Sequence, residues 1–264
     1  MKKYYVIGNP IEHSLSPQIH EYWMKKNNLN AFYKKQKLSN VDLPDYILKI
    51  KNKEIDGINV TVPFKKEIIV YLDELSAAAE KTQSVNTICL SNEKVIGHNT
   101  DINGFKFAIK DTKYDATNKK VFILGAGGVV SSIILALIDM NVSNIIVTNR
   151  TKSKADKLKN LFKNVNIVEW GDIPDFDMII NATSLGLKEA DKINLDFSNV
   201  GQNKIFYDVI YNPKETNFLK IAKNLGHRFE NGKMMFVYQA HQAFTLWHKI
   251  MPDIDDETIR LFDK

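Results

Sequence analysis

Three polar stretches in the first part of the sequence carry side chains that could move a proton. Lys65 lies in the first stretch, Asn86 in the second and Asp101 in the third. If the lysine and the aspartate meet in the fold, they form a pair that can pass a proton to or from the oxygen of a carbonyl or an alcohol, with Lys65 as the donor. The stretches read NVTVPFKK (59–66), SVNT (84–87) and HNTDINGF (98–105).

The same residues also have plain structural explanations. Asp101 could cap a helix, Lys65 could be a solvated surface lysine and Asn86 could fill a turn. However, each stretch carries further hydrogen-bonding side chains, and these recur after apolar segments. We therefore expect them to converge on one cleft. The further side chains are Asn59, Thr61, Thr87, Asn99 and Thr100.

A glycine-rich turn, Gly125-Ala126-Gly127-Gly128, lies between an apolar strand and an apolar helix. The glycines allow a tight turn and let backbone N–H groups approach a pyrophosphate at the positive end of the helix. A second apolar strand follows the helix. A strand, a glycine turn, a helix and a strand in this order predict a dinucleotide-binding site.

The end of that second strand decides which dinucleotide is expected. An NAD site usually presents Asp or Glu to the ribose 2′-hydroxyl at this point. This sequence has TNRT instead, and Arg150 offers a planar, permanently charged group that suits a 2′-phosphate. We therefore predict NADP as the cofactor, bound by Arg150 with Asn149, Thr151 and Lys154. A nicotinamide moves a hydride, which complements the proton transfer described above.

Hydrophobic periodicity predicts the elements that position these residues. In the first part, strands alternate with helices, and SVNTICLSNEKVIGHNT is expected to form a hairpin with its turn at Asn92-Glu93. In the second part, continuous apolar strands alternate with helices, which is typical of a parallel sheet covered on both faces. Strands are predicted at 4–7, 31–37, 55–64, 166–169, 178–181 and 205–208, with one more before the glycine turn and one ending near Thr148. Helices are predicted at 42–51, 64–82, 101–111 and 233–251.

Composition limits the class of protein. With 264 residues, 44% of them hydrophobic, the chain can bury one large or two modest cores, and we favour two domains. The net charge of +5 comes from scattered lysines, so neither a nucleic-acid-binding face nor such a partner is expected. The single cysteine, Cys89, excludes an intramolecular disulfide and a multi-cysteine metal site, and no metal is expected. Its low cysteine content, with no apparent signal peptide or membrane span, predicts a cytoplasmic protein.

These motifs, with several others in the same order, resemble those of the shikimate dehydrogenase family over nearly the whole chain. The resemblance implies a two-domain α/β fold: an N-terminal substrate domain, a Rossmann-type doubly wound NADP-binding domain, and the active-site cleft between them. It also implies NADP-dependent reduction of 3-dehydroshikimate to shikimate, in the pathway to chorismate and the aromatic amino acids. The motifs are GNPIEHSLSPQIH, NVTVPFK, VNT, NTDINGF, GAGG, NRT, NATSLG, YDVIYNP and YQAHQAF.

The resemblance also implies a division of labour along the chain. We expect the substrate-binding and catalytic domain at 1–101 and the NADP-binding domain at 102–234. A C-terminal helix at 235–264 is expected to pack back on the first domain.

Carried over position by position, the family's catalytic pair falls on Lys65 and Asp101. Ser14 and Ser16 resemble the hydroxyl partners of the substrate carboxylate. The other implied substrate contacts are Asn59, Thr61, Asn86, Tyr211 and Gln239.

On the cofactor side, the resemblance implies the same glycine turn and the same basic stretch that the residues themselves indicate. It adds the loop of Thr183 and Ser184, which follows a later strand, and two positions near the nicotinamide, Val209 and Gly232. The implied cofactor contacts are Gly125, Ala126, Gly127, Gly128, Asn149, Arg150, Thr151, Thr183, Ser184, Val209 and Gly232.

Four positions depart from the expected patterns. Val130 stands at the third glycine of the usual G-x-G-x-x-G, so the helix there must pack around a larger side chain. Ser131 occupies a position that is often basic in relatives, which would weaken pyrophosphate binding. GKMMF has Met234 and Phe236 where the family commonly shows GMxML, which affects the expected backbone contact to the nicotinamide.

Three other functions remain open at this point. A quinate/shikimate dehydrogenase that uses NAD is one, although Ser16 and Arg150 argue against it. A catalytically inactive NADP-binding module is another, and the catalytic pair argues against that. A glutamyl-tRNA or tetrahydrofolate-linked dehydrogenase would share the cofactor domain but would not explain the serine loop. The protein is expected to be a monomer or a homodimer that binds a small-molecule substrate and no membrane.

Overall fold

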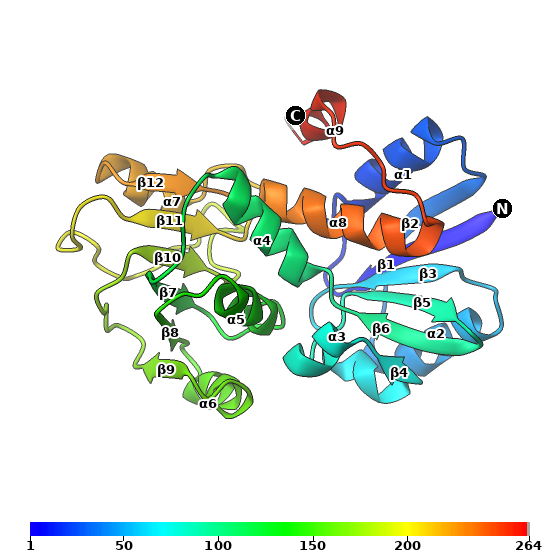
Figure 1. The fold of residues 1–264 in the computed structure, drawn as a ribbon, viewed down its shortest axis with the longest axis horizontal. Coiled ribbons are helices and arrows are strands. Elements are labelled where there is room, and N and C mark those ends of the chain that lie inside the picture. The colour runs from blue at the N-terminus through cyan, green and yellow to red at the C-terminus, as the bar shows by residue number, and fades with distance from the viewer. Residues whose placement is uncertain (263–264) are drawn as a thin grey trace. The chain divides into compact units, whose positions relative to one another are not determined.

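The chain folds into two compact units in the computed structural model, which describes residues 1–262 (Figure 1). Unit 1 comprises Met1–Gly104 together with the described chain from Val237 onward, and unit 2 is Phe105–Phe236. Each unit contains one six-stranded sheet with helices packed on it. The two-domain α/β class predicted from the sequence is confirmed.

The sheet of unit 1 is mixed. Its strand order is β2-β1-β3-β5-β6-β4, in which β1 is parallel to both of its neighbours and the β5–β6 hairpin continues the sheet in antiparallel fashion. The hairpin turns at Asn92 and Glu93, as predicted, and both residues have positive φ, as a tight two-residue turn requires. The strands are β1 (Lys2–Gly8), β2 (Ala31–Lys37), β3 (Gly57–Val60), β4 (Glu74–Leu75), β5 (Thr87–Ser91) and β6 (Lys94–His98).

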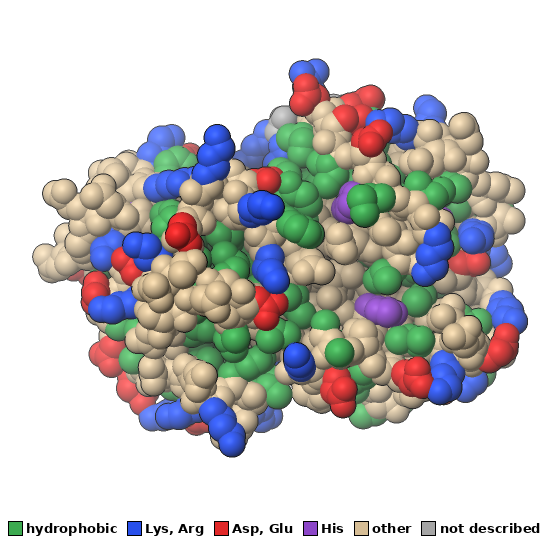
Figure 2. All heavy atoms as spheres, in the orientation of Figure 1, with side chains coloured by type: hydrophobic (Ala, Val, Ile, Leu, Met, Phe, Trp, Pro, Cys, Tyr) green, Lys and Arg blue, Asp and Glu red, His purple; other side chains and the backbone are tan. Residues whose placement is uncertain are grey.

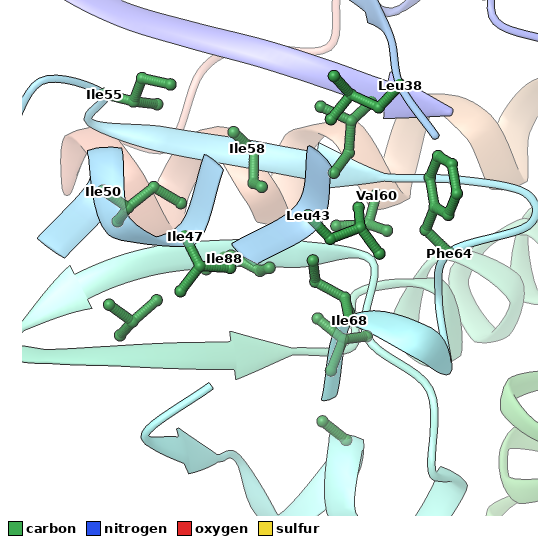
Figure 3. Close-up of a cluster of buried hydrophobic side chains, with 14 residues drawn as sticks. Leu38, Leu43, Ile47, Ile50, Ile55, Ile58, Val60, Phe64, Ile68 and Ile88 are labelled. Atoms are coloured by element: carbon green, nitrogen blue, oxygen red, sulfur yellow. The ribbon is translucent and has the colours of Figure 1, made fainter. Parts of the chain in front are cut away.

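The helices of unit 1 cover both faces of its sheet. Successive side chains of a strand point to opposite faces, so in β1 Ile7 joins one core and Tyr4 joins another. The first core packs against α2 and is drawn in Figure 3. The second is an aromatic cluster in which Tyr4 meets Trp247 of α8, and His20 of α1 meets Phe244 of α8. The elements are α1 (Ser16–Lys26), η1 (Asn40–Asp42), α2 (Leu43–Lys51), η2 (Glu67–Tyr71), α3 (Ala77–Thr82) and α9 (Asp256–Arg260), with α4 (Asp101–Asp111) and α8 (Lys233–His248) crossing the boundary between the units.

Two predicted helices in unit 1 were wrong in extent. The single helix predicted over 64–82 is replaced by η2, the short strand β4 and α3, because the polar Asp73 pairs with Val95 N and draws this segment onto the edge of the sheet. The C-terminal helix predicted to run from 235 to 264 ends at His248, and a separate helix, α9, follows. Lys249 adopts a positive φ of 56° and Pro252 cannot continue a helix, which explains the break. Residues 263–264 of that prediction lie outside the described residues.

The sheet of unit 2 is parallel throughout, with the order β12-β11-β10-β7-β8-β9. The chain builds one half outward from β7 and the other half from β10, so the strand order reverses between these two strands. In such doubly wound sheets, ligands bind beyond the carboxyl ends of the strands at this reversal. The elements are β7 (Lys120–Leu124), α5 (Val130–Asp139), β8 (Asn144–Thr148), α6 (Lys152–Leu161), β9 (Val165–Val168), β10 (Met178–Asn181), β11 (Ile205–Asp208), α7 (Asn217–Asn224) and β12 (Arg228–Glu230).

The surface agrees with the scattered charge seen in the sequence. Lysine and arginine side chains are dispersed over the face shown in Figure 2, with aspartate and glutamate among them. No helix within residues 1–262 is both long enough and apolar enough to cross a bilayer.

Candidate active site

Lys65 lies in the turn that follows β3, and buried neighbours on both sides fix that turn. Phe64 and Ile68 both belong to the α2-facing core, where Figure 3 shows them among the buried side chains below β3. The backbone carbonyl of Lys65 accepts a hydrogen bond from Val85 N at 2.8 Å. The Lys65 residue is only 9% exposed. An ammonium group is thus held on a rigid backbone and largely removed from water.

The ammonium of Lys65 is paired with the carboxylate of Asp101. Lys65 Nζ lies 2.6 Å from Asp101 Oδ2, although the two residues are 36 positions apart in the chain. Asp101 is the first residue of α4, where the helix dipole favours a negative charge. Its backbone N–H donates to Asn99 Oδ1 at 3.1 Å. The pair has the geometry needed to deliver a proton to an oxygen placed beside it.

Asn86 connects this pair to two other segments of unit 1. Its Oδ1 accepts from Thr100 N at 2.7 Å, and its Nδ2 lies 2.9 Å from Asp101 Oδ1 and 2.9 Å from Thr100 Oγ1. The same Nδ2 is 3.4 Å from Gln239 Oε1, in α8. Asn86 is 2% exposed, so these bonds form away from solvent. The amide therefore orients the carboxylate of Asp101 and leaves its other oxygen for Lys65.

Asn59 extends the polar cluster along β3. Its Nδ2 donates to Asn86 O and to Thr87 Oγ1, both at 3.0 Å. Its Oδ1 accepts from the hydroxyl of Tyr33 at 2.7 Å. Sequence reasoning missed Tyr33, because nothing in the pattern of β2 distinguishes this buried tyrosine from a core residue.

The serine loop lies at the start of α1. Ser14 Oγ is 3.1 Å from Ser16 Oγ, and Ser16 N donates to Ser14 Oγ at 3.3 Å. Ser16 is the first residue of the helix and Pro17 follows it, as is common in a first turn. Thr61, half-buried just after β3, is fixed by a hydrogen bond from its N–H to Ile7 O at 2.9 Å. Two hydroxyls at a helix N-terminus suit a carboxylate.

The glycine turn of unit 2 has the geometry that a pyrophosphate site needs. Gly125 has a φ of +113°, and a Cβ there would lie 2.8 Å from Ala182 O, so only glycine fits. A Cβ built on Gly127 meets no atom within 4 Å, so the turn is open on that side. The chain then enters α5, whose N-terminus favours an anion. Ser131, in the first turn of α5, is fully buried and its Oγ lies 3.4 Å from Gly128 O.

The basic stretch follows β8 directly. Asn149 Nδ2 donates to Thr151 O at 2.8 Å and so shapes the turn into α6. Arg150 and Lys154 are exposed, and no carboxylate among residues 1–262 is paired with Arg150. The guanidinium of Arg150 is therefore available to a phosphate group. These residues, together with the glycine turn, fit a dinucleotide that carries a 2′-phosphate.

Two further loops of unit 2 carry the remaining predicted cofactor residues. Thr183 Oγ1 donates to Asn181 Oδ1 at 2.7 Å, and Ser184 beside it is exposed. Gly232 lies so close to the carbonyl of Val209 that no side chain could be accommodated there. This contact explains why the turn before α8 requires a glycine.

Comparison with known proteins identifies the family. Residues 6–88 match the shikimate dehydrogenase substrate-binding domain, and residues 107–200 match shikimate/quinate 5-dehydrogenase. The chain is 56% identical over 262 residues to the NADP(+)-dependent shikimate dehydrogenase of Pelagibacter ubique, covering 99% of each protein. The chain belongs to the shikimate dehydrogenase family. The resemblance predicted from the ordered motifs is thus confirmed.

Solved structures of family members have the same fold. The shikimate dehydrogenase of Aquifex aeolicus aligns with a TM-score of 0.89 at 32% identity, covering 100% of this chain and 96% of that one. The shikimate 5-dehydrogenase of Thermus thermophilus, solved in complex with NADP(H) and shikimate, aligns with a TM-score of 0.90 at 28% identity, covering 100% of this chain and 99% of that one.

The predicted residues of unit 1, apart from Thr61, fall into two contact groups. One is joined by hydrogen bonds and contains Lys65, Asp101, Asn86, Asn59 and Gln239. The other is the serine pair at the start of α1. Tyr211 lies in unit 2, where its ring stacks on that of Phe236 at 4.5 Å. The roles assigned to all these residues remain predictions.

Proposed function

We propose that this chain catalyses the reversible, NADP-dependent reduction of 3-dehydroshikimate to shikimate, in the pathway to chorismate and the aromatic amino acids. The observation that carries the proposal is the buried Lys65–Asp101 ion pair, at 2.6 Å, in a member of the shikimate dehydrogenase family. An ammonium held this way can protonate the oxygen of a carbonyl as its carbon is reduced. The enzyme is thus an oxidoreductase whose own residues supply the proton.

The catalytic step divides between cofactor and protein. When bound, NADPH supplies a hydride to the carbonyl carbon. Lys65 donates a proton from Nζ to the carbonyl oxygen, so that one hydride and one proton convert the ketone to the alcohol. Asp101 holds Lys65 through Oδ2 and is itself oriented by Asn86 through Oδ1. In the reverse direction, Lys65 takes the proton back from the hydroxyl.

The substrate is proposed to lie against the polar cluster of unit 1. Ser14 and Ser16 bind its carboxylate, as two hydroxyls at a helix N-terminus can. The ring hydroxyls are bound by amide and hydroxyl side chains, which can each donate and accept. These are Asn59, Thr61, Asn86 and Gln239, with Tyr211 contributed by unit 2.

The cofactor is NADP, and we propose that unit 2 binds it. The glycine turn, Gly125 to Gly128, holds the pyrophosphate at the start of α5. Arg150, helped by Asn149, Thr151 and Lys154, binds the 2′-phosphate. Thr183, Ser184, Val209 and Gly232 contact the nicotinamide half. On this assignment the substrate domain spans 1–101 together with the C-terminal segment from residue 235, and the NADP-binding domain spans 102–234.

We also propose a cellular setting and an assembly state. A chain with one half-buried cysteine has no disulfide to maintain, and an NADPH-dependent reductase works where reducing cofactor is available, so we place it in the cytoplasm. We propose that it acts as a monomer or a homodimer, since Lys65, Asp101 and Asn86 already meet within one chain and the pair needs no residue from a partner.

One assay separates this function from its alternatives. The purified protein is given shikimate or quinate, each with NADP or NAD, and cofactor reduction is followed by absorbance at the nicotinamide band. We expect the highest rate of turnover with shikimate and NADP. Equal rates with quinate and NAD would identify the broader dehydrogenase instead, and no turnover in any combination would indicate an inactive NADP-binding module.

A further inference from the structure

A buried polar network in unit 2 joins the loops that leave the carboxyl ends of β10 and β11. Its centre is Asp208, the last residue of β11, which is fully buried. Oδ1 of Asp208 accepts from Asn181 Nδ2 at 3.1 Å and from Ile210 N at 3.0 Å. Oδ2 accepts from Thr216 Oγ1 at 2.6 Å. We call Asn181, Asp208 and Thr216 the strand-end network.

Asn181 carries the network into the neighbouring loop. Its Oδ1 accepts from both Thr183 N, at 3.1 Å, and Thr183 Oγ1, at 2.7 Å. Its Nδ2 donates to Leu185 O at 3.0 Å in addition to Asp208. Every donor and acceptor of the amide is therefore used, which fixes the loop that follows β10.

The buried carboxylate of Asp208 is unfavourable for the stability of the fold. All three of its donors are neutral, and no cation among the described residues is paired with it. Burial raises the pKa of Asp208 to about 6, despite the opposing effect of these hydrogen bonds. A buried charge of this kind destabilises a fold compared with apolar packing of similar volume. Its presence therefore calls for an explanation other than stability.

The location of the network supplies that explanation. Asn181 ends β10, one of the two strands at which the sheet order reverses, and Gly125 of the glycine turn lies directly against the Ala182 carbonyl. Ligands of doubly wound sheets bind at this point. The loops fixed by the network are those that carry Thr183 and Val209.

We propose that the strand-end network positions the nicotinamide ring for hydride transfer by fixing the loops of Thr183 and Val209. This inference rests on the proposed function, because it is there that these two residues are assigned to the nicotinamide half. Hydride transfer depends on near-contact geometry, and a displacement of about 1 Å costs about 100-fold in rate. The 2′-phosphate site at the end of β8 lies two strands away from β10, about 10 Å across the sheet, and does not depend on the network.

The test compares two substitutions at Thr216. Thr216→Val removes the hydroxyl that donates to Asp208, whereas Thr216→Ser keeps it. With NADPH and 3-dehydroshikimate, we expect Thr216→Val to lower kcat by about tenfold or more, since a buried charged acceptor loses its partner. The primary deuterium isotope effect on kcat should rise, because hydride transfer becomes slower than product release. Affinity for adenosine 2′,5′-bisphosphate, which reports the 2′-phosphate site alone, should change by less than about twofold, because distant sites act independently.

Two further variants separate positioning from folding. Thr216 also caps α7 by accepting from Leu219 N at 3.4 Å, so Ser76→Ala, which removes the matching cap of α3 in unit 1, is the control for a lost cap. We expect it to leave kcat and the isotope effect unchanged. Asp208→Asn is the second test should Thr216→Val fail to fold, because it retains Oδ1 for two donors but cannot accept from Thr216 at the other position. It should lower kcat without lowering the unfolding temperature.

The outcomes distinguish this inference from the proposed function. Wild-type kcat and isotope effect in both Thr216→Val and Asp208→Asn would overturn the inference while leaving the enzyme assignment intact. An equal loss of kcat in Ser76→Ala, or no recovery in Thr216→Ser, would also overturn it. If the wild-type protein neither binds adenosine 2′,5′-bisphosphate nor oxidises NADPH, the proposed function is wrong and the inference is wrong with it.

Discussion

Each unit of the molecule buries an aspartate to which we assign a role, and the surroundings of the two carboxylates are opposite. Asp101 in unit 1 lies 2.6 Å from the ammonium of Lys65, so its charge is compensated directly. Asp208 in unit 2 meets only neutral donors, and its pKa is raised to about 6 by burial. The difference fits the roles proposed for them: a proton-transfer pair needs two charges in contact, whereas a loop anchor needs several acceptor positions on one side chain.

The largest effect is expected when the cation that compensates Asp101, the ammonium of Lys65, is removed. Lys65→Ala should lower kcat by about 10²- to 10⁴-fold, because the general acid is lost. NADP affinity should change by less than about twofold, since the glycine turn and Arg150 are untouched. Steady-state kinetics and a cofactor titration measure the two effects. Lys66→Ala, an exposed neighbour, is the control, and an equal loss of turnover in that variant would contradict the role of Lys65.

Unit 1 also contains a buried basic side chain, His20, whose charged form is disfavoured by burial. Its ring stacks on Tyr33 at 4.4 Å, and neither ring nitrogen has a hydrogen-bond partner among the described residues. Desolvation lowers the pKa of His20 to about 3, so the unfolded chain binds the proton more readily. Stability is therefore complete above about pH 6.5 and falls as the pH drops toward 3. Between about pH 7.5 and pH 4.5, His20 should account for a loss of about 3 kcal/mol.

This loss is measurable by denaturant unfolding at several pH values. His20→Phe keeps an aromatic ring in the cluster and should flatten the acid limb of the stability curve. His13→Gln, at an exposed histidine, should leave the curve as it is in the wild-type protein. An unchanged acid limb in His20→Phe would show that other groups cause it.

Asp208 should give a pH dependence of the reverse sign. Its pKa is raised in the folded state, so its contribution to stability is complete below pH 3.8 and is lost as the pH rises through about 6. Asp208→Asn removes this titration. As the pH rises from about 4.5 to about 8, the free energy of unfolding of the variant should increase by about 2 kcal/mol relative to that of the wild-type protein. A constant difference across this range would mean that the carboxylate is not strained by burial.

The smallest expected effect concerns a charge that is exposed. Arg150 in unit 2 is free to bind a phosphate, and Arg150→Ala should raise the KM for NADP about tenfold, as the loss of one charged hydrogen bond does. The KM for NAD, which has no 2′-phosphate, should change by less than about twofold. Equal changes for both cofactors would refute the 2′-phosphate assignment. Lys157→Ala, on the exposed part of α6, is a matched control.

Local patterns were sufficient to predict much of the fold. The hairpin turn at Asn92-Glu93, the parallel strands of unit 2 and the helix that starts at Asp101 all follow from nearby residues. The helix predicted at 64–82 was wrong, because β4 pairs there with β6, a strand some way further along the chain. The break after His248 was missed because the apolar pattern continues past it, although Pro252 was a signal that could have shown it.

The site was less accessible to sequence reasoning than the fold. Lys65 and Asp101 could be nominated as a pair, but only the sheet of unit 1 brings residues 36 positions apart to 2.6 Å. Nothing in the sequence of β2 pointed to Tyr33, and Asp208 stood only within the YDVIYNP motif, with no role indicated for it. Their importance arises from partners contributed by other segments, Asn59 in one case and Thr216 in the other.

Unit 1 is assembled from two separate parts of the chain, and this affects how the protein is made. Trp247, near the end of α8, donates from its indole N–H to Ile88 O at 3.1 Å, and Gln239 lies beside Asn86. When only Met1–Gly104 has emerged from the ribosome, the part of unit 1 that begins at Val237 is therefore still missing. Unit 2, which is continuous in sequence, can fold during translation, whereas unit 1, to which we assign the catalytic pair, requires the final stretch of the nascent polypeptide. A chain that ended before Val237 would therefore contain all of unit 2 up to that point but an incomplete unit 1.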